Sequence, residues 1–170
     1  MEFKYILSQF VIKRFKKHQY LIQEGDASVY AYFVNSGLLK LVYSEESGKQ
    51  HIVSFAWEDW WESDFTAFYT QHKATMSLEC LEDTEVYCFT YEGYQNICNT
   101  IQKMERFFLV KANFGFLSAQ RRILSLMTSS AQERYDQLLE QYPSLFQRLP
   151  KSVIASFLGV SRETLSRFSS

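Results

Sequence analysis

The sequence lacks the features that mark secreted, membrane-spanning and metal-binding proteins. Its three cysteines, Cys80, Cys88 and Cys98, form no CxxC or Cys/His cluster, so we expect reduced thiols in or near the core rather than disulfides or a metal centre. No apolar run reaches the roughly 20 residues that a membrane span needs. The N-terminus has no basic flank, apolar centre or small-residue cleavage site of a signal peptide. These absences predict a cytoplasmic protein that makes no contact with a membrane.

Catalytic motifs are also missing. The sequence contains no nucleophile–base arrangement, no phosphate-binding loop and no His, Cys or carboxylate cluster with metal-ligand spacing. The acidic pairs Glu45-Glu46 and Glu82-Asp83 stand in predicted turns, where charged side chains are ordinarily solvated. We therefore expect no enzyme, no metal and no cofactor.

What the chain does have is enough apolar material for a folded core and an uneven charge. Of its 170 residues, 46% are hydrophobic and 17% are aromatic. Residues 1–101 hold eight basic and fourteen acidic side chains, whereas residues 102–170 hold ten basic and five acidic ones. The net charges are therefore −6 and +5, which indicates an acidic front and a basic back that could bind a polyanion.

Short strands are predicted over most of the first half. Turn-forming clusters at Glu24-Gly25-Asp26, Asn35-Ser36-Gly37 and Glu46-Ser47-Gly48 recur at a spacing of about 11 to 12 residues. The segments between and after them are rich in β-branched and aromatic residues and are Tyr30–Val34, Leu38–Tyr43, Ile52–Ala56, Thr75–Cys80 and Glu85–Thr90. This pattern predicts an antiparallel barrel or sandwich.

From Tyr91 onward the pattern becomes helical. Apolar residues recur at a spacing of three or four, as a coiled-coil seam requires, with Arg121 at the one polar step; they are Phe107, Val110, Phe114, Leu117 and Leu124. We expect this stripe to form a dimer interface, and the alternative is that it packs on the protein's own sheets. Ile101, Met104 and Phe108 offer a second apolar face for that purpose. Arg134–Tyr142 predicts another amphipathic helix that ends at Pro143, and Pro150 predicts the start of a further one.

The last twenty residues fit a helix-turn-helix. Such a motif needs a small residue where two helices cross, a glycine or similar residue in the turn and an apolar residue that plugs the second helix. Ala155, Gly159 and Leu165 meet these needs, with Ile154, Leu158 and Val160 also apolar. Ser161 is a good N-cap for the second helix.

The second helix carries side chains that can read DNA. Arg162 and Arg167 can bind guanine in a bidentate fashion, and Glu163 can accept a hydrogen bond from cytosine. Ser161 and Thr164 can bind phosphate or a base edge, and Lys151 can bind phosphate. Arg121, Arg122 and Arg148 are further basic residues that could meet phosphates. An ordinary solvated helix face is the alternative reading.

The whole pattern resembles the Crp/Fnr family of dimeric transcription regulators. The front carries the markers Leu21-Ile22-Gln23-Glu24-Gly25-Asp26, Tyr32-Phe33-Val34-Asn35-Ser36-Gly37 and Leu81-Glu82-Asp83-Thr84-Glu85-Val86. The back carries Ser161-Arg162-Glu163-Thr164 followed by Arg167, which is similar to the family's recognition helix. The resemblance implies an α+β fold: an N-terminal antiparallel β-roll of jelly-roll-like form, a long dimerisation helix and a C-terminal all-α helix-turn-helix domain.

The sequence departs from the family where a cyclic nucleotide would bind. The family's nucleotide binders use a Gly-Glu pair for the ribose, and an arginine followed by Ser or Thr for the cyclic phosphate. Here Ser63-Asp64 stands where Gly-Glu would, and Ala74 takes the arginine's place before Thr75. Lys73 could substitute only from a neighbouring position, which points to another face of a strand. We therefore expect that cyclic AMP does not bind.

An effector site, if one exists, is predicted around this same segment. Its candidate residues are Trp61, Ser63, Asp64, Phe65, Lys73 and Thr75. Aromatic side chains gather in this segment and would either fill the effector cavity or line it for an apolar or planar ligand. They are Trp57, Trp60, Trp61, Phe65 and Phe68. We favour the interpretation that they fill the cavity. The chain has neither the N-terminal cysteine cluster of the family's oxygen sensors nor an evident haem ligand.

We therefore predict a dimeric DNA-binding transcription regulator that recognises a near-palindromic duplex. The predicted domains are a sensor over 1–98, a dimerisation helix over 99–128 and a DNA-binding domain over 129–170. The chain ends at Ser170, three residues after Arg167, which predicts a short recognition helix. The alternative function is a ligand-sensing or protein-interaction module whose DNA binding is weakened or lost.

Overall fold

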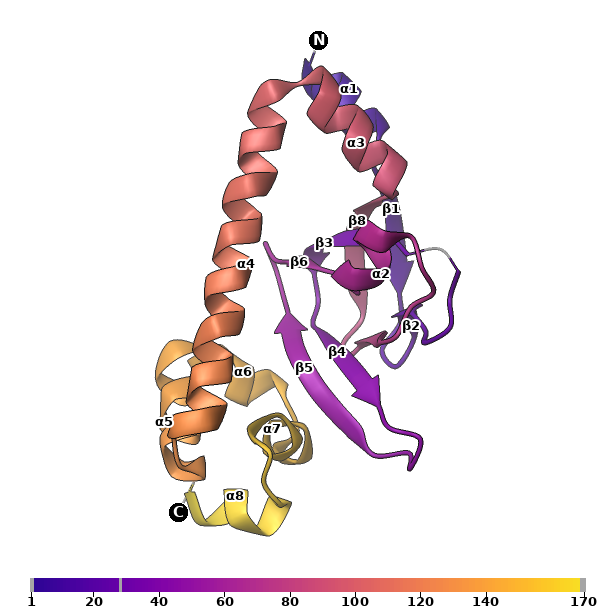
Figure 1. Ribbon diagram of the computed structural model, residues 1–170. Coiled ribbons are helices and arrows are strands. Elements are labelled where there is room, and N and C mark those ends of the chain that lie inside the picture. Colours follow the sequence, from indigo (N-terminus) through magenta and orange to yellow (C-terminus); the bar gives the residue numbers. More distant parts are fainter. Residues whose placement is uncertain (1, 28, 169–170) are drawn as a thin grey trace. The chain divides into compact units, whose positions relative to one another are not determined.

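The computed structural model describes residues 2–27 and 29–168. The chain divides into two compact units, Met1–Glu105 and Arg106–Ser170, here called the front unit and the rear unit. The front unit is built mainly from strands and the rear unit from helices (Figure 1), which confirms the predicted α+β class.

The front unit contains two four-stranded antiparallel sheets, with the strand orders β1-β8-β3-β6 and β2-β7-β4-β5. The strands are β1 (Val11–Phe15), β2 (Tyr20–Ile22), β3 (Ala31–Ser36), β4 (Leu39–Ser44), β5 (Gln50–Ala56), β6 (Trp61–Glu62), β7 (Ser77–Cys80) and β8 (Thr84–Phe89). The strands that the sequence predicted correspond to β3, β4, β5, β7 and β8. Strands β1, β2 and β6 were not predicted.

Side chains that alternate along the strands form the core of the front unit. Leu41 in β4 pairs with Leu78 in β7, and Val34 in β3 pairs with Val86 in β8. All four side chains are buried. Tyr32 is buried beside them, and its hydroxyl donates a hydrogen bond to a carbonyl of β2 at 2.8 Å. Because side chains alternate between the two faces of a strand, this burial fixes the register of the sheets.

The predicted turns are confirmed by their glycines. Gly25, Gly37 and Gly48 have φ angles of 92°, 107° and 82°, a region that side chains rarely adopt. Gly37 is the most constrained of them, since a Cβ atom there would collide with the hydroxyl and backbone of Thr84. The loop between β3 and β4 therefore requires glycine for both its conformation and its contact.

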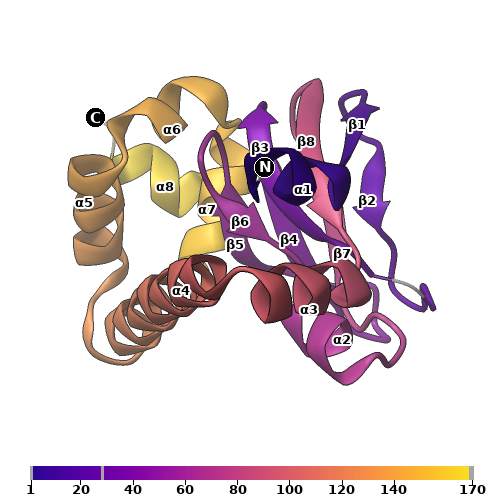
Figure 2. The same cartoon turned by 90° about the horizontal axis from the view of Figure 1, so that it is seen from above.

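The described residues of the front unit include the helices α1 (Glu2–Ser8), α2 (Phe65–Thr70) and α3 (Tyr91–Thr100). The change to helix at Tyr91 was predicted, and Thr90 caps α3 by accepting a hydrogen bond from the Gly93 N–H at 3.1 Å. Helices α2 and α3 are neighbours (Figure 2), and the rings of Phe68 and Tyr91 lie 5.7 Å apart edge to face. Helices α1 and α2 were not predicted.

The long helix α4 (Gln102–Thr128) leads into the rear unit. It is followed by α5 (Ala131–Gln141), α6 (Pro143–Arg148), α7 (Lys151–Leu158) and α8 (Arg162–Phe168), which gather at the C-terminal end of α4 (Figure 1). Ser130 and Glu133 form a reciprocal capping box that begins α5. The start of α5 is thus encoded locally, within a few residues of the end of α4.

The two prolines stand at the starts of helices, Pro150 as the N-cap of α7 and Pro143 at the first position of α6. Pro150 is the N-cap of α7, which confirms the predicted helix start. Pro143 was predicted only to end the preceding helix, and it also opens α6, a helix that the sequence analysis did not include. Proline suits the first helical position because its missing N–H has no partner there in any case.

Candidate functional site

Helices α7 and α8 form a compact helix-turn-helix. Gly159 ends α7 in the left-handed conformation, with a φ of 72°. Its own N–H and that of Val160 close the last turn on the Ala155 carbonyl. Ile154, Leu158 and Leu165 are each at most 3% exposed and fill the space between the helices. The predicted turn and apolar core are therefore confirmed.

Ser161 caps the second helix, as predicted. Its hydroxyl accepts a hydrogen bond from the Thr164 N–H at 3.1 Å, and its carbonyl accepts one from the Leu165 N–H at 3.0 Å. Capping fixes the first turn of α8, which contains Arg162 and Glu163, whereas Arg167 lies in the last turn. Arg162, Glu163 and Arg167 are all exposed on this helix.

Glu163 is held in its charged form. Its own backbone N–H and the Ser161 hydroxyl lower the pKa of its carboxyl group, and Arg162 adds a smaller Coulomb effect. Helix α8 therefore exposes one carboxylate, of Glu163, and two guanidinium groups, of Arg162 and Arg167. These groups can both donate to guanine and accept from cytosine.

Lys151 is exposed at the start of α7, whereas Arg122 is engaged inside the rear unit. The guanidinium of Arg122 lies 3.6 Å from the ring centroid of Phe157 and donates a hydrogen bond to the Phe157 carbonyl at 3.2 Å. Arg122 is therefore engaged by α7 in this arrangement, and its suggested contact with phosphate stays a prediction.

The predicted dimer stripe lies open along α4. Its five side chains have exposed fractions between 38% and 66%, and they are Phe107, Val110, Phe114, Leu117 and Leu124. By contrast, Ile101 and Phe108, on the second apolar face, are buried. An apolar stripe of this length that faces water is typical of a surface that another chain covers.

In the front unit, the predicted effector residues Asp64 and Thr75 are brought together. Asp64 is fully buried, and its Oδ2 accepts hydrogen bonds from the Thr75 N–H at 2.8 Å, the Thr75 hydroxyl at 3.1 Å and the Met76 N–H at 3.1 Å. Its Oδ1 accepts a fourth from the Ala67 N–H at 3.1 Å, which caps α2. A single carboxylate thereby joins the start of α2 to the segment that precedes β7.

The other predicted effector residues point elsewhere. Ser63 donates its hydroxyl hydrogen to the Tyr30 carbonyl at 2.8 Å. The ring of Trp61 packs among Phe10, Phe33 and Phe89, at centroid distances of 6.2, 5.2 and 5.3 Å. Phe65 is 39% exposed and stacks on Tyr69, and Lys73 is exposed. Of the predicted set, Asp64 and Thr75 are joined directly by hydrogen bonds.

Glu62 is a buried acid that the sequence analysis gave no role. Its carboxylate accepts a hydrogen bond from the Ser54 hydroxyl at 2.6 Å, which links β6 of one sheet to β5 of the other. Burial raises the pKa of Glu62 to about 7, although hydrogen bonds from Ser54 and the Ser63 N–H oppose the increase. The flanking aromatic residues Trp60 and Trp61 were the only sequence signal for this burial.

The cysteines are free, as predicted, with Cys80 and Cys88 buried and Cys98 half-buried. Burial raises the pKa of Cys80 to about 11, so its thiol is protonated and unreactive at neutral pH. Within residues 2–27 and 29–168, no three His, Cys, Asp or Glu side chains gather closely enough to hold a metal ion. No helix in this described part of the chain has the length and apolarity to cross a bilayer.

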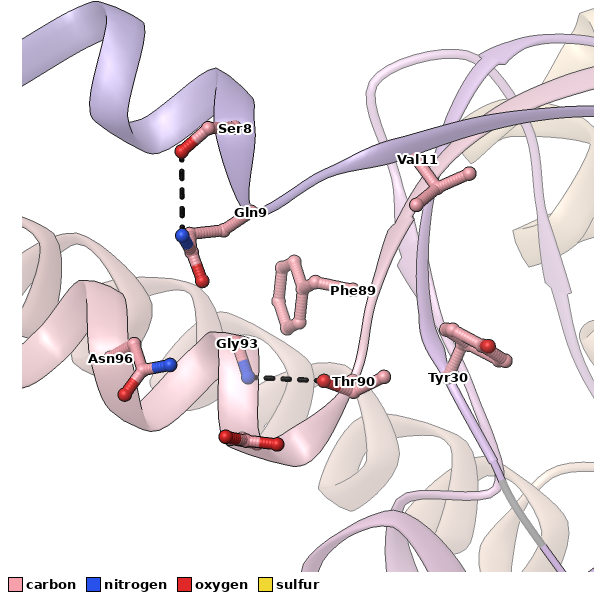
Figure 3. Close-up of a pocket in the computed structure, with 9 residues that line it drawn as sticks. Ser8, Gln9, Val11, Tyr30, Phe89, Thr90, Gly93 and Asn96 are labelled. Carbon is pink, nitrogen blue, oxygen red and sulfur yellow. Dashed lines mark hydrogen bonds between the residues drawn. The ribbon is translucent and has the colours of Figure 1, made fainter.

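A surface hollow of about 360 Å³ lies between α1 and the first turn of α3 (Figure 3). Gln9, just after α1, and Asn96, on α3, line it together with Phe89. As far as the described residues go, its lining includes none of the residues predicted for the effector site. It is therefore a separate feature of the front unit.

Comparison with known proteins places the front unit in a family. Residues 12–101, more than half of the chain, match the family described as the cyclic nucleotide-binding domain. No curated protein sequence matches the chain closely enough to count as a relative.

Solved structures share the fold of both units at low sequence identity. The c-di-GMP-responsive global regulator CLP of Xanthomonas campestris is 16% identical, with a TM-score of 0.78 over 98% of this chain and 88% of that one. FixK2 of Bradyrhizobium japonicum is 16% identical, with a TM-score of 0.80 over 94% and 82%. A transcriptional regulator assigned to the Crp/Fnr family, from Eubacterium rectale, is 18% identical, with a TM-score of 0.74 over 98% and 80%. The chain therefore belongs to the cyclic nucleotide-binding domain family, and its fold is that of the Crp/Fnr regulators.

Proposed function

We propose that this protein is a homodimeric, DNA-binding transcription regulator of the cytoplasm, and not an enzyme. The observation that carries the proposal is α8, a capped helix whose apolar plug Leu165 is 2% exposed while Arg162, Glu163 and Arg167 face outward. A helix held in this way by a preceding helix and a tight turn is the geometry that enters a major groove. Regulators such as CLP share the fold and support the proposal.

The proposed roles on DNA follow from side-chain chemistry. Arg162 and Arg167 bind guanine O6 and N7, and Glu163 accepts from the cytosine amino group. Ser161 and Thr164 sit at the start of α8, where hydroxyls contact phosphate or a base edge. Lys151 binds phosphate from the start of α7 and carries no sequence information.

The dimer would form through the stripe on α4 defined above. Two copies paired along their long helices present two α8 helices to successive major grooves, about 34 Å apart on one face of the duplex. The exposure of Phe114 and Leu124, 66% and 61%, supports this pairing because a lone helix would leave both in water. A two-fold dimer implies a near-palindromic target.

Cyclic AMP is not the proposed effector of the front unit. A cyclic phosphate needs a charge partner, and Ala74, which takes the place of the family's arginine, is buried and uncharged. The backbone of Ala74 is occupied in turn, since its N–H donates to the Asp26 carbonyl at 2.9 Å. The Thr75 and Met76 donors already bind the Asp64 carboxylate. The residues present therefore do not fit a cyclic nucleotide.

Selection of bound duplexes from a random library tests the DNA-binding proposal. The full-length chain should enrich a near-palindrome whose half-sites are one helical turn apart. Failure to enrich any half-site would contradict it and favour a ligand-sensing or protein-interaction module with weakened or lost DNA binding. Titration calorimetry with cyclic AMP tests the front unit separately. Tight binding in that titration would overturn the proposal that the front unit does not bind cyclic AMP.

A further inference from the structure

The C-terminal end of α7 has an unusual set of partners. A helix leaves the carbonyl groups of its last turn without intrahelical donors, and these must be satisfied from elsewhere. In α7 the Ala155 and Ser156 carbonyls accept hydrogen bonds from the turn backbone of Gly159 and Val160. The next carbonyl groups, of Phe157 and Leu158, accept from arginine side chains of two other helices.

Arg122 comes from α4, the proposed dimerisation helix. Its Nη2 donates to the Phe157 carbonyl at 3.2 Å while its guanidinium lies over the Phe157 ring at 3.6 Å. Arg122 thus contacts both the backbone and the ring of Phe157. The combined contact requires a planar guanidinium, since the ammonium group of lysine cannot stack on a ring in the same way.

Arg134 comes from α5 and binds the neighbouring carbonyl. Its Nε and Nη2 both donate to the Leu158 carbonyl, at 3.2 and 3.0 Å. Its Nη1 donates to the Ser129 carbonyl at 2.6 Å, directly after the end of α4. One guanidinium therefore joins the end of α4 to the end of α7.

Two positive charges consequently meet at one helix end. The carbonyl end of a helix carries partial negative charge and attracts cations, which accounts for both arginines being there. Burial and, to a smaller extent, the charge of Arg134 together lower the pKa of Arg122 to about 10, so Arg122 stays protonated at neutral pH. The attraction between the α7 carbonyl groups and the two guanidinium groups opposes the repulsion between Arg122 and Arg134.

We propose that Arg122 and Arg134 form a clamp that fixes the helix-turn-helix to the C-terminal end of α4 and so positions α8 for DNA. This inference rests on the proposed DNA-binding function. The clamp supplies the fixed geometry that a dimer needs, because two recognition helices meet successive grooves only if each is held rigidly relative to its own α4. Both arginines are positioning residues and touch no DNA.

The test uses R122K and R134K in the full-length chain, each of which keeps the charge and removes the planar fork. The matched control is R106K, at an exposed arginine on the same long helix. We expect R122K and R134K each to weaken binding to the selected duplex by roughly tenfold, the worth of a charged hydrogen bond. The control should leave the affinity unchanged.

The salt dependence of binding separates positioning from direct contact. A clamp residue leaves the slope of log affinity against log salt unchanged in R122A, because the number of neutralised phosphates stays the same. A slope that falls by about one would mean that Arg122 binds a phosphate, and it would overturn the clamp. Full affinity in both lysine variants would overturn it as well.

Hydrogen exchange without DNA keeps the clamp testable if DNA binding itself fails. In R122K and R134K, we expect faster exchange at the amides of Gly159, Val160 and α8, with α5 and the front unit unchanged. Unchanged exchange at those amides would overturn the clamp, as would a uniform increase over the whole rear unit, which means general destabilisation. Selective exchange in a protein that enriches no duplex would leave the clamp standing and refute the proposed function alone.

Discussion

The Oδ2 atom of Asp64 accepts a hydrogen bond from the Thr75 N–H at 2.8 Å, although the two residues lie eleven positions apart in the chain. The Asp64 carboxylate joins the start of α2 to the segment that precedes β7. We therefore expect its loss to lower the stability of the front unit.

Replacement of Asp64 by Asn should lower the free energy of unfolding by roughly 2–4 kcal/mol, because buried N–H and O–H donors would lose a charged acceptor. Urea denaturation measures the change. E24Q is the control, since Glu24 is an exposed carboxylate of the same unit and its loss should change little. A D64N protein as stable as E24Q would show that the four hydrogen bonds contribute nothing.

Glu62 should make stability depend on pH. Burial raises its pKa in the folded protein to about 7 from an ordinary value of 4.5, so the fold favours the neutral acid. The free energy of unfolding should therefore decline as the pH rises from 4.5 to about 7, by at most about 3 kcal/mol, and this contribution should be constant above that range. E62Q should flatten the profile, whereas E46Q, at an exposed position, should not. An identical profile in E62Q and the wild type would refute the assignment.

Phe114 and Phe116 offer a matched pair for the dimer seam. They are 66% and 63% exposed on α4, but only Phe114 belongs to the predicted stripe. A glutamate in the seam would bury a charge, so F114E should weaken dimerisation by roughly a hundredfold or more. F116E should leave the dimer intact. Sedimentation velocity compares the two, and equal effects would mean that the stripe is not the interface.

Arg162 and Lys151 should differ in how they affect DNA binding. R162A should cost about 1–3 kcal/mol and relax specificity at one position of the half-site. K151A should weaken binding evenly across sequences and reduce the salt slope by about one. Affinity measurements on a set of single-base variants at several salt concentrations separate these outcomes. An even loss in R162A would identify a phosphate contact instead.

Much of the fold is visible in the sequence because its signals are local. The turns at Gly25, Gly37 and Gly48 depend on a backbone conformation that glycine alone adopts easily, so composition reveals them. The helix-turn-helix is similar, since Gly159 and Ser161 each act within a few residues of their own position. Local chemistry of this kind predicts structure well.

The elements that were missed depend on partners far away in the chain. Strand β1 is fixed by its pairing with β8, where Lys13 stands opposite Val86. Helix α2 covers only six residues and is capped by Asp64, whose other oxygen binds Thr75 and Met76. Short elements such as these gain their stability from tertiary contacts rather than from propensity.

The sequence predicted which residues belong to the candidate site better than it predicted the contacts that their side chains make. Arg162, Glu163 and Arg167 lie on the exposed face of α8, as the helical pattern implied. The contacts of Arg122 were not predicted, because the sequence shows a basic residue but not whether its guanidinium stacks inside or extends into solvent. The contact of Arg134 with Leu158 could not be predicted for the same reason. A backbone carbonyl can accept a hydrogen bond whatever the residue type, so the identity of Leu158 gives no sign of the contact.

The buried carboxylate of Asp64 also sets a condition on any soluble anion. A group tethered to its own binding site competes at an effective concentration in the millimolar range or above, and it cannot diffuse away. An anion in solution would have to displace this tethered carboxylate before it could bind the Thr75 and Met76 N–H groups. We therefore expect changes in the concentration of free phosphate to have little effect on this segment.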